Sequence, residues 1–271
     1  MNQFEQFQAA LDLTKVSDNI FSFTPDSRYF VGNTPHGGYL LALMNKAMVQ
    51  VLPHSSAINS NVYYLDRTEP EPAELHVEVL RTSKGSSMGQ VKLIQNKKIT
   101  CLYSSLCSDF EYMKGYSGLG TPLPPIINAV KQDDFKVMSY ESIGSGSTPA
   151  FIKQLNMSVH PDHAWWDRDI SSDAAEARCS AYLELEGGVA DTFVLSYLAD
   201  ILPPVVQNKF GSLGWIPTLT LTCNIRQLPK TNLLFIDGHA KDISNGYFEQ
   251  DCCKWDMDCL LYTSPSPRDK R

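Results

Sequence analysis

The stretch TPHGGYLLALMNKAMVQVLP, residues 34–53, decides the fold. From Tyr39 onward its apolar residues recur at helical spacing, and the run ends at Pro53. Few polar residues interrupt it, so nearly the whole surface of this helix is apolar. A helix that is apolar on all sides is normally buried. The sequence therefore predicts one buried helix with a glycine-rich start at Gly37 and Gly38.

Strand-like segments follow the helix. Leu75, Val77 and Val79 alternate with polar residues, which is the period-2 pattern of a half-buried strand. Turn residues separate this segment from its neighbours, which favours antiparallel hairpins. The predicted strands are 57–67, 74–84, 88–95 and 99–110.

The same order of elements returns in the second half of the chain. A strand is predicted at 174–186, an apolar helix at 192–199, and three further strands at 218–228, 233–244 and 247–257. Between the halves, parts of 114–150 are rich in Gly, Ser and Pro and indicate a linker. The chain is thus predicted to use one architectural unit twice, at 1–113 and 151–258.

Composition excludes several classes of protein. The 271 residues include 23 Lys+Arg and 30 Asp+Glu, a net charge of −7, which argues against a nucleic-acid partner. No secretion signal is visible at the start, and no apolar run is long enough to span a membrane. The seven cysteines include no C-x-x-C pair and lie mostly in strand-like runs. We expect them to be reduced core residues of a cytoplasmic protein.

An antiparallel sheet around one apolar helix is the hotdog architecture, and two copies make a double hotdog, an α+β fold. Five motifs make the likeness specific: HGGYL at 36–40, EVLR at 78–81, LADILPP at 198–204, GWIPTLTLT at 214–222 and WDMD at 255–258. In this order they resemble the motifs of the double-hotdog acyl-CoA thioesterases.

The resemblance implies two antiparallel sheets, each wrapped around a long apolar helix. It implies hydrolysis of a fatty acyl-CoA to the free acid and CoA, in lipid metabolism, without a cofactor or a metal. It is also compatible with homo-oligomers formed through the hotdog sheets.

Thioester hydrolysis needs a positioned water, a base and donors for the developing oxyanion. Asp200 stands at the end of the second apolar helix, where a carboxylate is costly to bury unless it is paired or used. The alternative is a carboxylate on the surface at a helix end. The resemblance implies that Asp200 is the catalytic aspartate and that Thr218 helps to hold the attacking water. Members of the family usually carry an acidic residue at the place of Thr220, so the sequence departs from the pattern there.

His36, Gly37 and Gly38 precede the first helix, whose free N–H groups favour a negatively charged oxygen. We expect these residues to bind the thioester carbonyl, although a simple glycine turn is the alternative. Basic residues near the turns of the first meander are candidates to contact the phosphates of CoA. They are Arg67 and Arg81, with Lys84, Lys97 and Lys98 beside them.

The C-terminal segment 259–271 departs from the family. It resembles a translated sequencing adapter, and it contains two prolines that a central strand is not expected to accommodate. We therefore expect 259–271 to be a non-native tail that replaces a strand carrying a catalytic glutamine. No Gln occurs after Gln250, so we expect this chain to bind acyl-CoA and to be weakly active or inactive in hydrolysis.

Two other functions compete with a thioesterase. A non-catalytic acyl-CoA or CoA binder would explain Thr220 and the missing glutamine. A hotdog dehydratase is disfavoured, because no His/Asp or His/Glu pair stands at a helix start.

Overall fold

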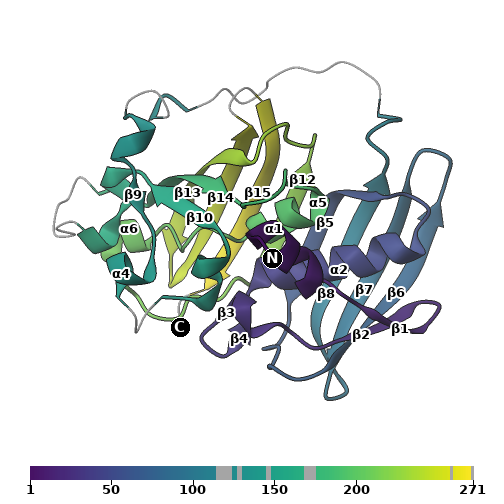
Figure 1. Ribbon diagram of the computed structural model, residues 1–271. Coiled ribbons are helices and arrows are strands. Elements are labelled where there is room, and N and C mark those ends of the chain that lie inside the picture. Colours follow the sequence, from purple (N-terminus) through teal and green to yellow (C-terminus); the bar gives the residue numbers. More distant parts are fainter. Residues whose placement is uncertain (114–123, 127–129, 145–147, 168–174, 257–258, 270–271) are drawn as a thin grey trace.

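The computed structural model describes residues 1–113, 124–126, 130–144, 148–167 and 175–256, and the backbone of 259–269 (Figure 1). Within these ranges thirteen strands form one antiparallel sheet, in the order β1-β2-β6-β7-β8-β5-β12-β15-β14-β13-β11-β10-β9. A short separate pair is formed by β3 (Phe30–Val31) and β4 (Thr34–Pro35).

The first half matches the predicted helix and meander within a few residues. The helix is α2 (Gly37–Val51), and it precedes β5 (Ser56–Tyr64), β6 (Ala73–Thr82), β7 (Ser87–Gln95) and β8 (Lys98–Ser108). β1 (Thr14–Ser17) and β2 (Ile20–Phe23) extend the sheet beyond β6. Most side chains of α2 are buried, as its apolar sequence requires.

The second half repeats this order with a shorter helix. Its elements are β11 (Arg178–Glu184), α5 (Thr192–Leu198), β12 (Thr220–Ile225), β13 (Leu233–Ser244), β14 (Tyr247–Asp256) and β15 (Cys259–Asp269). The predicted strands and the predicted helix are confirmed. The helix α5 has only seven residues and is followed by a turn at 199–200. Pro203 and Pro204 come next, and prolines there cannot continue a helix.

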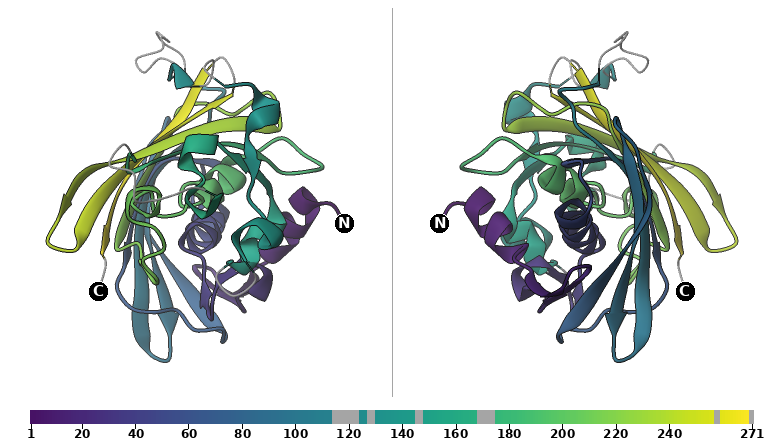
Figure 2. Two further views of the ribbon diagram at one scale, coloured as in Figure 1. Left: turned by 90° about the vertical axis from the view of Figure 1, so that its left-hand side faces the viewer. Right: turned by 90° about the vertical axis from the view of Figure 1, so that its right-hand side faces the viewer.

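The two halves join edge to edge. Pairs from Thr220 opposite Tyr63 to Asn224 opposite Asn59 link β12 to β5, so the two expected sheets form one continuous sheet. Figure 2 shows this sheet curving around α2 and α5, which lie side by side. The double hotdog is confirmed, with its two sheets fused.

Short elements fill the connections. They are η1 (Ser27–Tyr29), η2 (Gln132–Asp134), β9 (Lys136–Val137), α4 (Tyr140–Ile143), η3 (Ala150–Gln154), β10 (Asn156–Val159), η4 (Pro161–His163), η5 (Trp165–Asp167) and α6 (Gln207–Phe210). Of these, β9 falls inside the stretch predicted as a linker, and it pairs with β10 of the second half. Phe135 and Met138 of that stretch are buried. The described part of 114–150 therefore packs with the second half.

The sequence predicts no helix before residue 34, and the structure has one there, α1 (Gln3–Ala10). The Asn2 side chain accepts from Glu5 N at 2.8 Å, and the Glu5 carboxylate accepts from Asn2 N at 3.2 Å. This reciprocal pair is a capping box. Phe4 N donates to Glu186 O at 3.0 Å, so the N-terminal helix docks on the second half.

The expectation that two prolines exclude 259–271 from the sheet is wrong for the backbone. β15 lies between β12 and β14, and Pro265 and Pro267 stand opposite Asp251 and Glu249 of β14. Pairing with β12 uses Tyr262 and Thr263, which precede both prolines. The missing N–H groups therefore fall beyond the paired part of β12. The proposed non-native origin of this segment stays a prediction.

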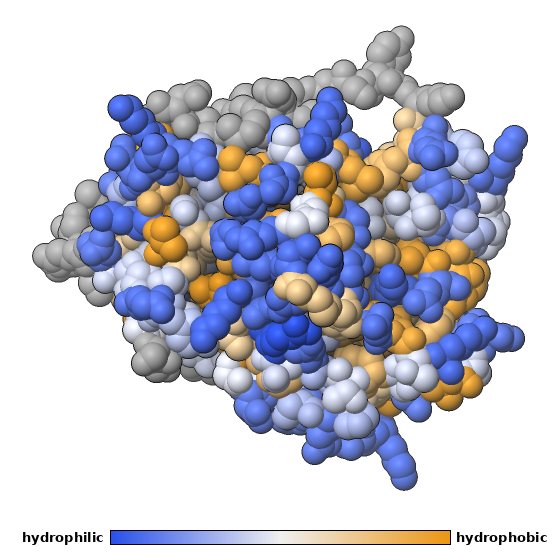
Figure 3. Space-filling view, in the orientation of Figure 1, coloured by the Kyte–Doolittle hydropathy of each residue, from blue (hydrophilic) through white to orange (hydrophobic). Residues whose placement is uncertain are grey.

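The cysteines were predicted to be core residues. Cys101, Cys107, Cys179, Cys223 and Cys252 are buried, which confirms that placement for them. No helix among the described residues is both long and apolar enough to cross a membrane. The face shown in Figure 3 is largely hydrophilic, with an apolar area on the side where β6 and β7 run in Figure 1.

Candidate active site

Asp200 and Thr218 meet as predicted. Asp200 lies two residues after the end of α5 and is only 8% exposed. The Thr218 hydroxyl, just before β12, donates to Asp200 Oδ1 at 2.9 Å. A nearly buried carboxylate is thus held by a hydrogen bond, and it still lines a cavity. The surface alternative for Asp200 is wrong.

His36 joins the first half to this carboxylate. Its Nε2 lies 3.0 Å from the backbone oxygen of Asp200, so this nitrogen carries the proton and donates. The same nitrogen lies 3.7 Å from Asp200 Oδ2. The His36 ring packs against Phe151, with centroids 4.3 Å apart. The histidine therefore fixes the turn that carries Asp200.

Gly37 has no room for a side chain. A Cβ there would lie 2.6 Å from Asp200 Oδ2 and 3.0 Å from the Tyr64 hydroxyl oxygen. The side chain of His36, at the N-cap position, does not cap α2, and Gly37 lines the cavity. A ligand oxygen in the cavity can therefore approach the positive end of this helix.

Gly38 has a different task from Gly37. Its Cβ would lie 2.1 Å from the backbone oxygen of Tyr197 in α5, and Gly38 does not line the cavity. A second contact between the helices lies further along α2, where Asn45 Nδ2 donates to Ser196 Oγ at 3.0 Å. The second glycine of the motif thus allows close packing of α2 on α5.

Tyr64, near the end of β5, is a site residue that sequence reasoning missed. Its hydroxyl donates to Gly37 O at 2.7 Å, and its side chain lines the cavity. The alternation of β5 gives the face on which Tyr64 lies, but it does not give the partner of its hydroxyl, which lies at the start of α2.

A cavity of about 960 Å³ holds these groups. Both halves contribute to its walls, and apolar side chains dominate one part of the lining: Leu40, Met138, Ile143, Phe151, Trp165, Trp166, Leu202 and Ile216. An apolar space beside a few converging polar groups suits a ligand with a reactive polar end and a hydrocarbon part.

Of the two arginines predicted to contact the CoA phosphates, one lies at the cavity and the other does not. Arg67 lines the cavity and is exposed, and its Nε donates to Thr34 Oγ1 at 2.7 Å. Arg81 lies near the end of β6, opposite Met88, and is not among the residues that line this cavity. Arg67 is therefore the better placed of the two for an anionic group at the entrance.

Lys254 on β14 is a second residue that sequence reasoning missed. Its side chain is fully buried, and its Nζ donates to the backbone oxygen of Leu198 at the end of α5. Burial lowers the pKa of Lys254 to about 7, while nearby thiols and Asp200 act in the opposite direction. An amine thus lies close to the turn that carries Asp200.

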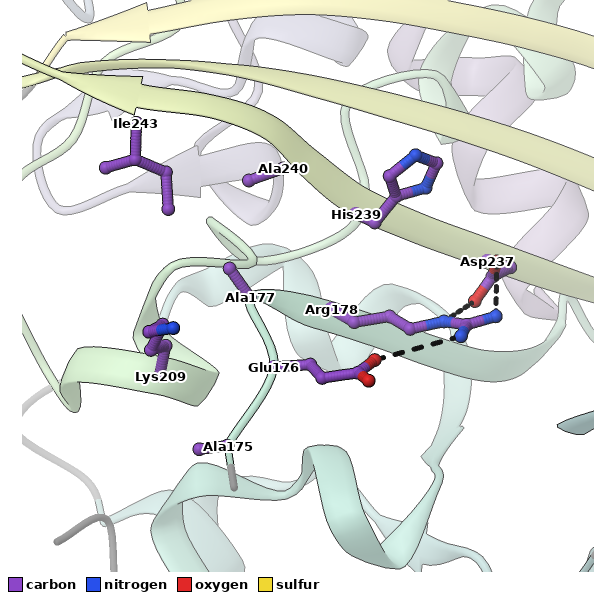
Figure 4. A pocket seen from close by; sticks show the side chains of 9 residues that line it. All are labelled: Ala175, Glu176, Ala177, Arg178, Lys209, Asp237, His239, Ala240 and Ile243. Atoms are coloured by element: carbon purple, nitrogen blue, oxygen red, sulfur yellow. Dashed lines mark hydrogen bonds and ion pairs between the residues drawn. The ribbon is translucent and has the colours of Figure 1, made fainter. Parts of the chain in front are cut away.

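A second cavity, of about 620 Å³, lies against β11 and β13 (Figure 4). The Arg178 guanidinium binds both oxygens of Asp237, at 2.9 and 3.0 Å. Glu176 and Lys209 add one charge of each sign. Since the acidic and basic groups balance, this cavity does not select a charged ligand.

Comparison with known families gives two matches. A model of the acyl-CoA thioesterase N-terminal domain matches residues 25–107, and a model of the C-terminal domain of the same family matches residues 130–264. The second match reaches into the segment predicted to be a non-native tail. No curated protein matches the chain.

Solved structures show the same fold. A putative thioesterase II from Thermobifida fusca YX is 20% identical, with a TM-score of 0.81 and 97% of each chain covered. A protein of unknown function with a hot dog fold from Alicyclobacillus acidocaldarius is 17% identical, with a TM-score of 0.81 and 98% of each chain covered. The acyl-CoA thioesterase II TesB2 of Mycobacterium marinum is 12% identical, with a TM-score of 0.72; 98% of this chain and 97% of that one are covered.

Proposed function

Because the chain belongs to the acyl-CoA thioesterase family, we propose that it hydrolyses the thioester of a fatty acyl-CoA by aspartate-assisted attack of water. One observation carries the proposal. The nearly buried carboxylate of Asp200, held by Thr218, lies beside the start of α2 and lines a cavity built by both halves.

In this reaction Asp200 takes a proton from a water molecule that Thr218 helps to orient. The water oxygen forms a bond to the thioester carbonyl carbon, and the carbonyl oxygen becomes an oxyanion beside the N-terminus of α2. The C–S bond then breaks, and the CoA sulfur receives a proton. The products are the free fatty acid and CoA.

The cavity lining supports a fatty acyl group as the substrate. Trp165, Trp166 and Phe151 offer apolar surface, and each buried CH₂ contributes about 0.8 kcal/mol. Arg67 at the exposed edge is the proposed contact for a CoA phosphate. A cytoplasmic location and assembly through the sheets belong to the same proposal.

Release of free thiol from a series of acyl-CoAs of increasing chain length tests this function. Because no glutamine follows Gln250, we expect slow release by the wild-type chain, and loss of that release in Asp200→Asn. Equal background rates in both proteins would contradict the hydrolase.

A non-catalytic acyl-CoA binder is the second candidate, because Thr220 occupies a place where the family usually has a carboxylate. Tight acyl-CoA binding by calorimetry, with no thiol release by wild type, would favour it.

A further inference from the structure

The side chain of Lys254 in β14 is fully buried. Lys254 stands opposite Ile236 of β13 and Tyr262 of β15, and its side chain points toward α5, where Nζ donates to Leu198 O. Burying an ammonium group is expensive, and an apolar side chain would fill this space at lower cost. The amine therefore has a use that packing alone does not supply.

The contact of Lys254 lies next to the proposed reaction centre. Leu198 O also accepts from Ile201 N at 3.2 Å, which closes the turn from 198 to 201. This turn carries Asp200, whose backbone oxygen accepts from His36. A displacement of Leu198 thus moves the carboxylate that Thr218 holds.

We propose that Lys254 is a positioning residue for Asp200. Its buried amine fixes the end of α5 through the hydrogen bond to Leu198 O, and its charge attracts the Asp200 carboxylate. This inference rests on the proposed function. Lys254 is not a catalytic residue, because it is not among the residues that line the cavity.

Charged and titratable groups surround the amine. Cys252 and Cys253 lie on β14, Cys223 on β12, and Asp200 follows α5. Burial raises the pKa of Cys223 to about 12 and that of Cys253 to about 11. On the other side of Asp200 stand His36 and Tyr64. Between about pH 6 and 8, around its pKa of about 7, Lys254 loses its charge while these two thiols keep their protons.

Two variants separate the charge from the hydrogen bond. Lys254→Gln keeps a donor without the charge, and Lys254→Met removes both. We expect kcat to fall about tenfold in Lys254→Gln and about 100-fold in Lys254→Met, with KM changed less than threefold, since small displacements of reacting groups cost about that much. Cys252→Ala, on the same strand, controls for loosening of β14 and should stay within threefold of wild type.

The pH profile gives a readout that a purely structural lysine would not move. Wild-type kcat should decline between about pH 6 and 8 as the amine, whose pKa is about 7, loses its proton, because a neutral amine donates a weaker hydrogen bond. Both Lys254 variants should lack this decline. Wild-type kcat values in Lys254→Met, or the same decline in both variants, would overturn the proposal.

Hydrogen exchange decides the inference even if the chain does not hydrolyse acyl-CoA. The Ile201 amide should exchange at least tenfold faster in Lys254→Met than in wild type, with Lys254→Gln between them. Unchanged exchange would overturn the positioning role. Absence of thiol release in wild type would overturn the proposed function alone.

Discussion

The two central helices begin in opposite ways. α2 starts after His36, which does not cap it with its side chain, and its first residue, Gly37, lines the cavity. α5 starts after Asp191, whose carboxylate accepts from Phe193 N at 2.9 Å and Val194 N at 2.8 Å. Gln8 of α1 donates to the other oxygen of Asp191 at 2.7 Å. One helix start thus lines the cavity, and the other is capped by a side chain of the chain itself.

The contrast continues along each helix. Asp200 is the ninth residue after Asp191, and Asn45 is the ninth after His36. Asp200 lines the cavity, whereas Asn45 is fully buried and donates to Ser196 Oγ. The helix start of the first half and the ninth position of the second half therefore hold the reactive groups. The equivalent positions, Asp191 and Asn45, stabilise the fold.

The largest effect expected is loss of activity in Asp200→Asn. The amide keeps the size of the carboxylate but cannot take a proton from water, so kcat should fall about 10²- to 10⁴-fold. Asp191→Asn is the matched control, because asparagine is also a good N-cap, and its rate should stay within about twofold of wild type. Thiol release measures both. Equal losses in the two variants would remove the distinction between the helix ends.

Substitution of each glycine of α2 by alanine distinguishes the reactive helix start from the packing contact between α2 and α5. Gly37→Ala places a Cβ against Asp200 Oδ2, and we expect kcat to fall about 100-fold with a small change in melting temperature. Gly38→Ala places its Cβ against Tyr197 O and should destabilise the fold by about 1–3 kcal/mol. Rates and urea unfolding curves of both variants check this. Loss of stability in Gly37→Ala alone would reverse the two roles.

Removal of the Thr218 hydroxyl should have a smaller effect on kcat. Thr218→Val keeps the shape and removes the donor to Asp200, so kcat should fall about tenfold, since a hydrogen bond to a charged group contributes about 1.5–3 kcal/mol. Thr218→Ser restores the donor and should recover most of the rate. Steady-state kinetics at saturating acyl-CoA measure this. A valine variant as fast as wild type would exclude Thr218 from water orientation.

Much of the fold follows from local patterns in the sequence. The all-apolar run of α2 and the alternation around Leu75 and Val77 both depend on neighbouring residues, so they predict elements within a few positions. The joining of β5 to β12 does not follow from such patterns, because strand pairing between distant segments is a tertiary choice. The place of β15 beside β12 was missed for another reason: its two prolines argue against a central strand, but both lie beyond the residues that pair with β12.

The candidate site divides in the same way. Asp200 and Thr218 could be named from motifs, and Gly37 from its place at a helix start. Tyr64 and Lys254 could not, since their roles depend on partners in the helices α2 and α5, which are distant in the sequence. One signal for Lys254 was available: it occupies the inward register of β14 together with Phe248 and Cys252. A lysine on the inward face of a strand predicts a buried amine with a structural or functional role.

The smallest effect concerns the closed helix end. Asp191→Ala removes the cap of α5 and the contact with Gln8, and it should reduce the free energy of unfolding by about 1 kcal/mol. Urea denaturation measures this loss, and Gln8→Ala is the control that breaks only the outer contact. Thiol release should be unchanged in both, because α5 begins away from the residues that line the cavity. If Asp191→Ala lowered kcat tenfold without loss of stability, the start of α5 would take part in catalysis. The assignment of catalysis to the start of α2 and of stability to the start of α5 would then be wrong.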